Sequence, residues 1–242
     1  MVHLLDDLGG FSARAQAFLR RTARRETSAR IGLPTDFMQV RDSSGRPILA
    51  PFELVIRREG FAEKFGGLRY DVRRSVILDK TRHDMMRRWD FDLAANAWSD
   101  RCGWYFDWIG EHVSSPVRFL IHTDGRMGVS DGGPFLEVAS SVTHLIESHA
   151  VMDAVSQWDP WSSSLEPWAP SRFGIDLASR IDGLSLIREA SGPFDEWWVS
   201  ESVAIRNFRT WTSHRPRTRG TMVWTNGDQG RQASRAARAE TR

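Results

Sequence analysis

The sequence predicts an α+β fold in which a strongly twisted antiparallel β-sheet is flanked by helices and followed by a C-terminal β extension. Three observations support this prediction. A helical pattern ends at two glycines and turns directly into a strand-like pattern at residues 52–72. Residues 88–139 contain short segments that alternate between apolar and polar residues, as half-buried strands do. A second helical pattern at 141–156 follows this series.

Before the first of these features, residues 11–30 have the pattern of a helix with Ser12 as its N-cap. One side is apolar, and the other side is basic and includes Arg20, Arg21, Arg24 and Arg25. A basic helix is typical of a nucleic-acid-binding surface, but also of a solvated face whose arginine stems lie over apolar surface. We favour the solvated face, because no base-reading or stacking motif accompanies the arginines.

The predicted helix at 52–64 is followed by Gly66 and Gly67 and then by strand-like residues 69–72. Gly66 stands just past the helix, where a glycine takes the left-handed backbone conformation without a Cβ clash. Gly67 then lets the chain reverse closely. We therefore predict that both glycines are structural turn residues at a corner between helix and sheet.

The alternating segments at 88–139 predict a meander of four or five antiparallel strands with one strongly aromatic face. Asp124 and Gly125 lie between two of these segments. Asp-Gly in such a place is the strongest short hairpin signal, since both central residues need a positive φ. Asp124 and Gly125 are therefore predicted turn residues.

The last third of the chain changes in composition twice. Residues 157–173 are rich in Trp, Pro and Ser and predict a loop or linker. Residues 174–226 predict a small β-rich extension that extends the first sheet or packs on it. Residues 227–242 are polar and Arg-rich, which is typical of a disordered basic tail. The expected organisation is thus an α+β domain at 1–156, the linker, the extension and the tail.

Three tryptophans of the linker are the predicted partner-binding residues: Trp158, Trp161 and Trp168. Interfaces favour Trp as an anchor. The alternative is that these rings pack back on the core, since large aromatic side chains are mostly well buried.

Charge and cysteine content limit the function classes. Residues 227–242 hold four Arg against one Asp and one Glu, a net of +2, which equals the formal charge of the whole chain. The body is therefore not a basic protein. Cys102 is the only cysteine, so no intrachain disulfide forms, which fits a reducing compartment. With no signal-peptide pattern and no long apolar stretch, we expect a cytoplasmic protein that does not enter a membrane.

A possible nucleophile is Ser130, in a segment that matches the Gly-x-Ser-x-Gly elbow, Gly128 to Gly132. That motif requires a helix after the serine, whereas the flanking residues here predict a hairpin. Cys102 follows Arg101, but no His is placed beside it by sequence, and we interpret it as a structural thiol.

Two patterns resemble metal sites. His144 and His149 are five residues apart, which separates them by about 140° around a helix, so they do not form the two-His pair of a zinc helix. Asp90 and Asp92 share one face of a strand and could hold a divalent cation, but alternating charge on a solvent face explains them as well, and we favour the solvent face. We therefore expect no catalytic residue, no metal and no cofactor.

The order of these elements resembles the SUKH superfamily over roughly residues 50–156. The resemblance implies an α+β domain that acts by binding. Many members are immunity proteins that neutralise a cognate toxin in bacterial polymorphic toxin systems, and others are regulators or adaptors. No catalytic residue carries over, and Gly66 and Gly67 carry over as structural positions only. The residues that support the resemblance are Phe65-Gly66-Gly67-Leu68-Arg69, Asp124-Gly125-Arg126, Ser140-Ser141 and Ser148-His149-Ala150.

The sequence therefore predicts a non-enzymatic, immunity-like module that binds a protein partner, a toxin domain by the resemblance. Two alternatives stay open. One is a nucleic-acid-associated protein that uses the Arg-rich N-terminal helix and the tail, with steeply salt-dependent binding. The other is a hydrolase of unrecognised type that uses Ser130.

Overall fold

The computed structural model describes residues 2–27, 39–42, 44–78, 81–112, 117–161, 178–209 and 219–239. The chain divides into two compact units: Met1–Asp71 with Arg87–Val142, and Val72–Met86 with Thr143–Arg242. This division differs from the predicted boundary after residue 156. The long strands β4 (Leu68–Leu78) and β5 (Thr81–Asp100) contribute residues to both units.

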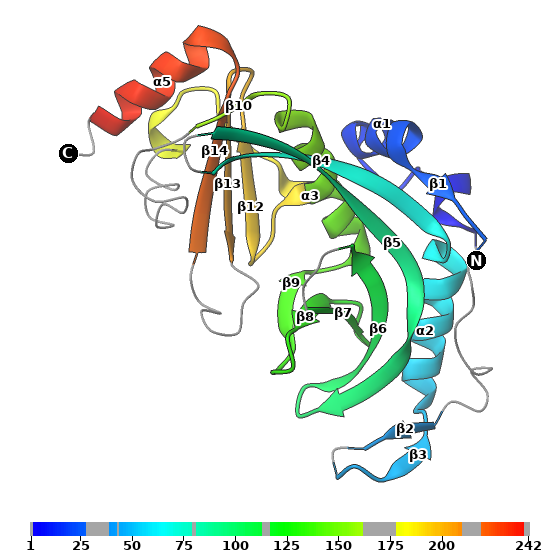
Figure 1. Cartoon of the computed structure of the whole chain (residues 1–242). Coiled ribbons are helices and arrows are strands. Elements are labelled where there is room, and N and C mark those ends of the chain that lie inside the picture. The colour runs from blue at the N-terminus through cyan, green and yellow to red at the C-terminus, as the bar shows by residue number, and fades with distance from the viewer. Residues whose placement is uncertain are drawn as a thin grey trace. The chain divides into compact units, whose positions relative to one another are not determined.

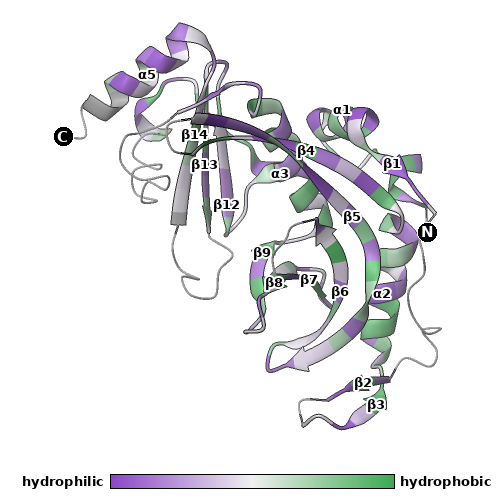
Figure 2. Ribbon diagram, in the orientation of Figure 1, coloured by the Kyte–Doolittle hydropathy of each residue, from purple (hydrophilic) through white to green (hydrophobic). Residues whose placement is uncertain are grey.

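A strongly curled antiparallel sheet of seven strands is the main element, in the order β1-β4-β5-β6-β7-β8-β9 (Figure 1). The α+β fold class is thus confirmed. Hydrophilic and hydrophobic residues follow one another along β5 (Figure 2), as in a strand with two different faces. The remaining strands of this sheet are β1 (Arg24–Arg25), β6 (Gly103–Glu111), β7 (Arg118–His122), β8 (Met127–Ser130) and β9 (Leu136–Ala139).

The C-terminal strands form a sheet of their own, in the order β10-β14-β13-β12-β11. β12 to β14 are successive antiparallel neighbours, joined by short or undescribed connections. A separate two-stranded sheet pairs β2 (Gln39–Arg41) with β3 (Pro47–Leu49). The strands of the C-terminal sheet are β10 (Asp159–Pro160), β11 (Ser185–Leu186), β12 (Asp195–Val199), β13 (Val203–Arg209) and β14 (Arg219–Thr225).

The N-terminal helix is shorter than the predicted one. After the 3-10 turn η1 (Leu4–Asp6), helix α1 spans Ala13–Thr22, with the Ser12 hydroxyl accepting the Ala15 N–H at 3.2 Å. The prediction of a helix to residue 30 is wrong, because the next residues are extended and pair with β4 as strand β1. Pairing with a neighbouring strand satisfies their backbone groups as well as a helix does.

Helix α2 (Phe52–Phe65) covers the aromatic face of the curled sheet. Its buried residues include Leu54, Phe61 and Phe65. The Phe61 ring centroid lies 5.7 Å from that of Phe106 and 5.9 Å from that of Trp108. Aromatic pairs at these separations add to the free energy that burial of their large apolar area already provides. This helix-on-sheet core is the centre of the first unit.

The corner after α2 forms where the sequence predicts it, but the two glycines exchange roles. Gly66 has a φ of −57°, and Gly67 has the left-handed φ of 77°. A Cβ on Gly66 would lie 2.3 Å from the Ala62 carbonyl oxygen, so this position has no room for a side chain. Gly67 supplies the reversal, and Gly66 supplies the close approach.

Helix α3 (Val142–Val155) lies in the second unit from Thr143 onward, and most of its polar side chains are buried together with its apolar ones. The second unit also contains the 3-10 turn η3 (Arg188–Ala190) and helix α5 (Gly227–Ala239). The prediction of a disordered tail is wrong for residues 227–239. Ala233 packs against a small apolar core that includes Val203, Ile205 and Val223, so the helix contacts the C-terminal sheet.

Among the described helices, none has the length and apolar character that crossing a membrane requires.

Candidate partner-binding surface

The predicted linker tryptophans do not form one described surface. Trp168 lies outside the described residues. Trp158 and Trp161 are both half-buried in the second unit. Trp161 donates its backbone N–H to the Val223 carbonyl at 2.8 Å and packs against the core of Val203, Ile205 and Val223. Trp161 therefore contributes to packing, as the alternative interpretation of these residues expects.

Ser130 does not have the geometry of a nucleophile elbow. It ends strand β8, and strand β9 follows instead of a helix. Its hydroxyl donates to the Gly133 carbonyl at 2.7 Å and accepts the Gly132 N–H at 3.2 Å. The side chain therefore closes the turn between two strands.

The two histidines of α3 are core residues. His144 and His149 are both buried, and burial lowers the pKa of each, for His149 well below its ordinary value. A Cβ on Gly192 would lie 2.7 Å from the His144 ring, so the backbone packs directly on this imidazole. Among the described residues, no group of three or more His, Cys, Asp or Glu is placed to hold a metal ion.

Asp90 and Asp92 are buried, so the prediction that they lie on a solvent face is wrong. Arg69 lies between them, with its Nε 2.8 Å from Asp90 and its Nη2 3.3 Å from Asp92. Asp92 also accepts the Gly67 N–H at 2.9 Å. The two carboxylates thus bind a guanidinium and fix the helix-to-sheet corner, because a buried charge requires such a partner.

Cys102 is exposed in the turn between β5 and β6. Its backbone N–H donates to Asp100 at 2.7 Å, and its carbonyl accepts a hydrogen bond from His122 Nε2 at 2.9 Å. The sequence did not indicate that His122 lies near Cys102, because only the pairing of β6 with β7 brings the two residues together. The ring binds the backbone of this turn and so stabilises it.

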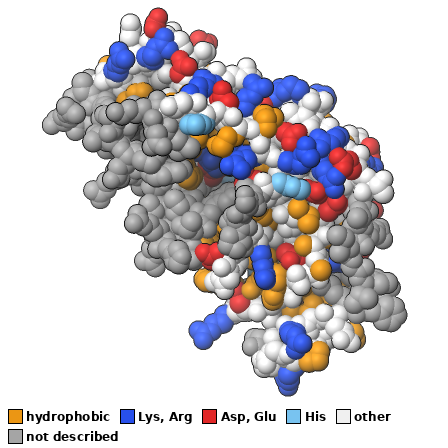
Figure 3. Space-filling model, in the orientation of Figure 1, with side chains coloured by type: hydrophobic (Ala, Val, Ile, Leu, Met, Phe, Trp, Pro, Cys, Tyr) orange, Lys and Arg blue, Asp and Glu red, His pale blue; other side chains and the backbone are white. Residues whose placement is uncertain are grey.

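The arginines near α1 have local partners. Arg20 donates to Gln16, Arg24 pairs with Glu26 at 2.7 Å, and Arg25 lies 3.5 Å from Asp6. Figure 3 shows basic side chains interspersed with acidic ones over this side of the molecule. This arrangement fits a solvated face better than a continuous track for phosphates.

The structure does bring together one surface that the sequence did not predict. We call it the Trp98 patch: Trp98, Tyr105, Arg118 and Phe135. Trp98 pairs with Tyr105 across β5 and β6, and Tyr105 pairs with His122 across β6 and β7, so these side chains share a face. The Trp98 and Tyr105 ring centroids are 5.9 Å apart, and Phe135 lies 5.9 Å from Tyr105.

Gly128 makes room for Phe135 in this patch. A Cβ at position 128 would lie 2.4 Å from Phe135 Cε2, so only glycine lets the ring lie over the strand. The Phe135 ring also lies 6.0 Å from the buried ring of His122. Gly128 belongs to the segment that resembles a hydrolase motif, and the structure gives it this packing role.

A buried carboxylate lies next to the patch on β6. Asp107 is buried on the same face of β6 as Tyr105, and it accepts hydrogen bonds from the Asn96 backbone at 2.8 Å and the Asn96 amide at 3.0 Å. Burial raises the pKa of Asp107, and burial also raises the pKa of Tyr105. Asp107 thus joins β6 to β5 by two hydrogen bonds next to the aromatic rings.

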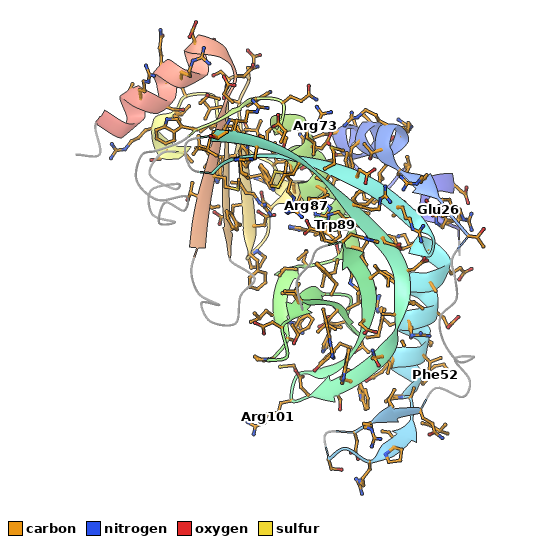
Figure 4. The ribbon with its side chains drawn as sticks, in the orientation of Figure 1. Glu26, Phe52, Arg73, Arg87, Trp89 and Arg101 are labelled. Carbon is orange, nitrogen blue, oxygen red and sulfur yellow. The ribbon has the colours of Figure 1, made fainter. Side chains whose placement is uncertain are left out.

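The top of the patch is open to solvent. The three rings are half-buried, and Arg118 is exposed, with its guanidinium carbon 5.1 Å above the centre of the Trp98 ring. Among the described residues, Arg118 has no ion pair. Arg101, in the neighbouring β5–β6 turn, points away from the ribbon (Figure 4). Half-exposed aromatic rings next to an available guanidinium have the composition of an interface centre.

Comparisons of the chain with family models, curated proteins and solved structures found no match. The functional argument therefore rests on the geometry of the chain itself.

Proposed function

We propose that this protein is a non-enzymatic, protein-binding module of the immunity type, which acts in the cytoplasm and neutralises a cognate toxin by covering its active surface. The observation that carries the proposal is the Trp98 patch. Trp, Tyr and Arg are the residues that most often dominate binding free energy, and they do so in clusters. Trp98, Tyr105 and Arg118 form such a cluster on the curled sheet.

The engagement of the reactive side chains supports the same proposal. Ser130 closes a turn, His144 and His149 are buried, and Asp90 and Asp92 bind Arg69. The resemblance to the SUKH superfamily, in which domains act by binding, adds the expectation that the partner is a toxin domain.

The experiment is a tagged pull-down of the full chain from its native host, with and without nuclease, followed by affinity measurement. We expect one stoichiometric protein that survives nuclease treatment. Replacing Trp98 and Tyr105 together by Ala is expected to weaken its binding by about thirtyfold or more, the scale of hot-spot residues. The partner's toxicity on expression, and its suppression by this protein, tests the immunity role.

Trp158→Ala is the matched control, because Trp158 is also a half-buried tryptophan but lies in the second unit. Loss of binding in Trp158→Ala with none in the Trp98 and Tyr105 variant would move the binding surface to the predicted linker residues. Material that disappears with nuclease would instead favour the nucleic-acid alternative.

A further inference from the structure

Arg118 is an exposed cation whose hydrogen-bonding capacity is largely unused. Its guanidinium lies over the Trp98 ring, 5.1 Å from the centroid, and it has no ion pair among the described residues. A guanidinium carries five N–H donors in a planar fork that matches a carboxylate in two-point contact. Contact with an aromatic face orients the fork and leaves its edge available.

The second unit shows how a carboxylate completes such a pair. Arg206 lies over the Trp197 ring at 5.2 Å, nearly the same separation as in the Trp98 patch. There, Asp195 accepts from Arg206 Nε at 2.7 Å and from Arg206 Nη2 at 2.9 Å. The exposed pair of Arg118 and Trp98 differs, because no carboxylate of the described residues forms an ion pair with Arg118. The charge of the buried Asp107 acts on Arg118, but both Asp107 oxygens bind Asn96.

We infer that the Trp98 patch binds an acidic segment of its protein partner, whose carboxylate occupies the position on Arg118 that Asp195 occupies on Arg206. This inference rests on the proposed protein-binding function and names the chemistry of the partner. Apolar side chains next to the carboxylate contact the rings of Tyr105 and Phe135. The charge of Arg118 is complementary to the partner's carboxylate, and the aromatic rings provide apolar area for the partner's apolar side chains.

A protein carboxylate fits this site better than a nucleic acid. The face of Trp98, the largest ring available for stacking a base, is already occupied by Arg118. The next arginine of the sheet, Arg126, is engaged by Asp124 at 2.6 Å and Glu137 at 2.8 Å. With Arg126 engaged, the patch presents Arg118 to a single anionic group and not a row of guanidinium groups that would follow a phosphate backbone.

The test is a selection of random displayed peptides on the full-length protein, with Arg118→Glu as the counter-selection. Enriched peptides are expected to carry Asp or Glu beside an apolar residue. A synthetic enriched peptide should bind wild type at least about tenfold tighter than its Asn or Gln counterpart, and Arg118→Glu should lose binding. Arg118→Lys should bind with intermediate affinity, because it keeps the charge but not the fork.

Several results would overturn the inference. These are a library that enriches no peptide, enriched peptides that lack a carboxylate, or equal affinity for wild type and Arg118→Glu. Tight, Arg118-dependent binding of an oligothymidine probe in the same buffer would overturn it in favour of nucleic acid. Thermal unfolding of Arg118→Glu, which changes an exposed residue, verifies that the variant is folded.

The host partner separates this inference from the proposed function. If replacing Trp98 and Tyr105 releases the partner while Arg118→Glu retains it, the binding surface stands and the carboxylate chemistry is wrong. If neither variant affects the partner, the patch is not the binding surface, and both the placement of that surface and the carboxylate chemistry are wrong.

Discussion

The molecule contains two arginine–tryptophan pairs of nearly equal geometry in very different surroundings. Arg206 lies 5.2 Å from the Trp197 ring, and Arg118 lies 5.1 Å from the Trp98 ring. The Arg206 side chain is 17% exposed and binds Asp195, whose side chain is 8% exposed. Arg118 is exposed and forms no ion pair among the described residues. The acid whose charge acts on it, Asp107, is buried and binds Asn96. The ring contact is the same, and the difference is burial together with the carboxylate.

The buried pair belongs to a hydrogen-bonded network in the second unit. Ser148 on α3 donates its hydroxyl to Asp195 at 2.6 Å and accepts the Trp197 indole N–H at 2.9 Å. Removing a charge from water is costly, so a buried guanidinium requires a carboxylate and the carboxylate requires further donors. At the surface, water meets that requirement. The exposed pair can therefore bind a partner protein, whereas the buried pair only stabilises the folded chain.

The largest expected effect comes from removing the cation of the buried pair. Arg206→Met leaves Asp195 buried without its main partner, which is expected to lower the free energy of unfolding by about 3–5 kcal/mol. Urea denaturation of the full chain measures it. The double variant Arg206→Met with Asp195→Leu replaces both charges by apolar groups and should lose less than the single variant. If Arg206→Met is as stable as wild type, the buried Asp195 carboxylate does not require a cationic partner.

The second prediction concerns pH. His149 is buried, and its pKa is lowered well below 6.5 by burial first and then by the charges of Arg74 and Arg206. Because the folded protein disfavours the charged ring, His149 contributes stability above pH 6.5 that is lost as the pH falls toward its folded pKa. His144, on the same helix, also has its pKa lowered by burial and has Asp195 and Glu147 nearby.

Urea midpoints measured from pH 8 to pH 5.5 should therefore fall on acidification. The loss is at most about 1.4 kcal/mol per pH unit for each such histidine. His149→Gln should flatten the profile without abolishing it, because the contributions of His144 and of His3, whose pKa burial also lowers, remain. A profile that stays as steep in His149→Gln would contradict the assignment.

The sequence predicted those parts of the fold that depend on local chemistry. The end of α2 at Gly66 and Gly67, and the alternating strands of the sheet, follow from backbone freedom and from a two-residue period. The length of α1 and the state of the C-terminal residues were predicted wrongly. Both depend on contacts with distant parts of the chain, namely β4 for the residues after α1 and Val203, Ile205 and Val223 for α5.

The Trp98 patch was not predictable from alternation. The register of β5 against β6 shifts between Asp90 and Leu93 and again between Leu93 and Ala97. Each shift changes which residue of β6 lies opposite a given residue of β5. The register of Trp89 with Glu111, continued without shifts, would place Trp98 opposite Cys102, whereas Trp98 pairs with Tyr105. Phe135 reaches the patch only because Gly128 has no side chain. The burial of Asp90 and Asp92 was not predictable from the sequence either, because Arg69, which pairs with both carboxylates, comes from another strand.

The smallest expected change in stability, that of Arg118→Met, is the most direct test of the comparison between the two arginine–tryptophan pairs. Arg118→Met removes an exposed cation–ring contact, which is worth about 0.5–1 kcal/mol at most, and methionine keeps part of the packing on Trp98. The free energy of unfolding should therefore change by no more than about 0.5 kcal/mol, against several for Arg206→Met, in the same urea experiment. A loss of about 3 kcal/mol or more would mean that Arg118 serves the fold as Arg206 does. The inference that Arg118 binds a carboxylate of another protein would then have no physical support.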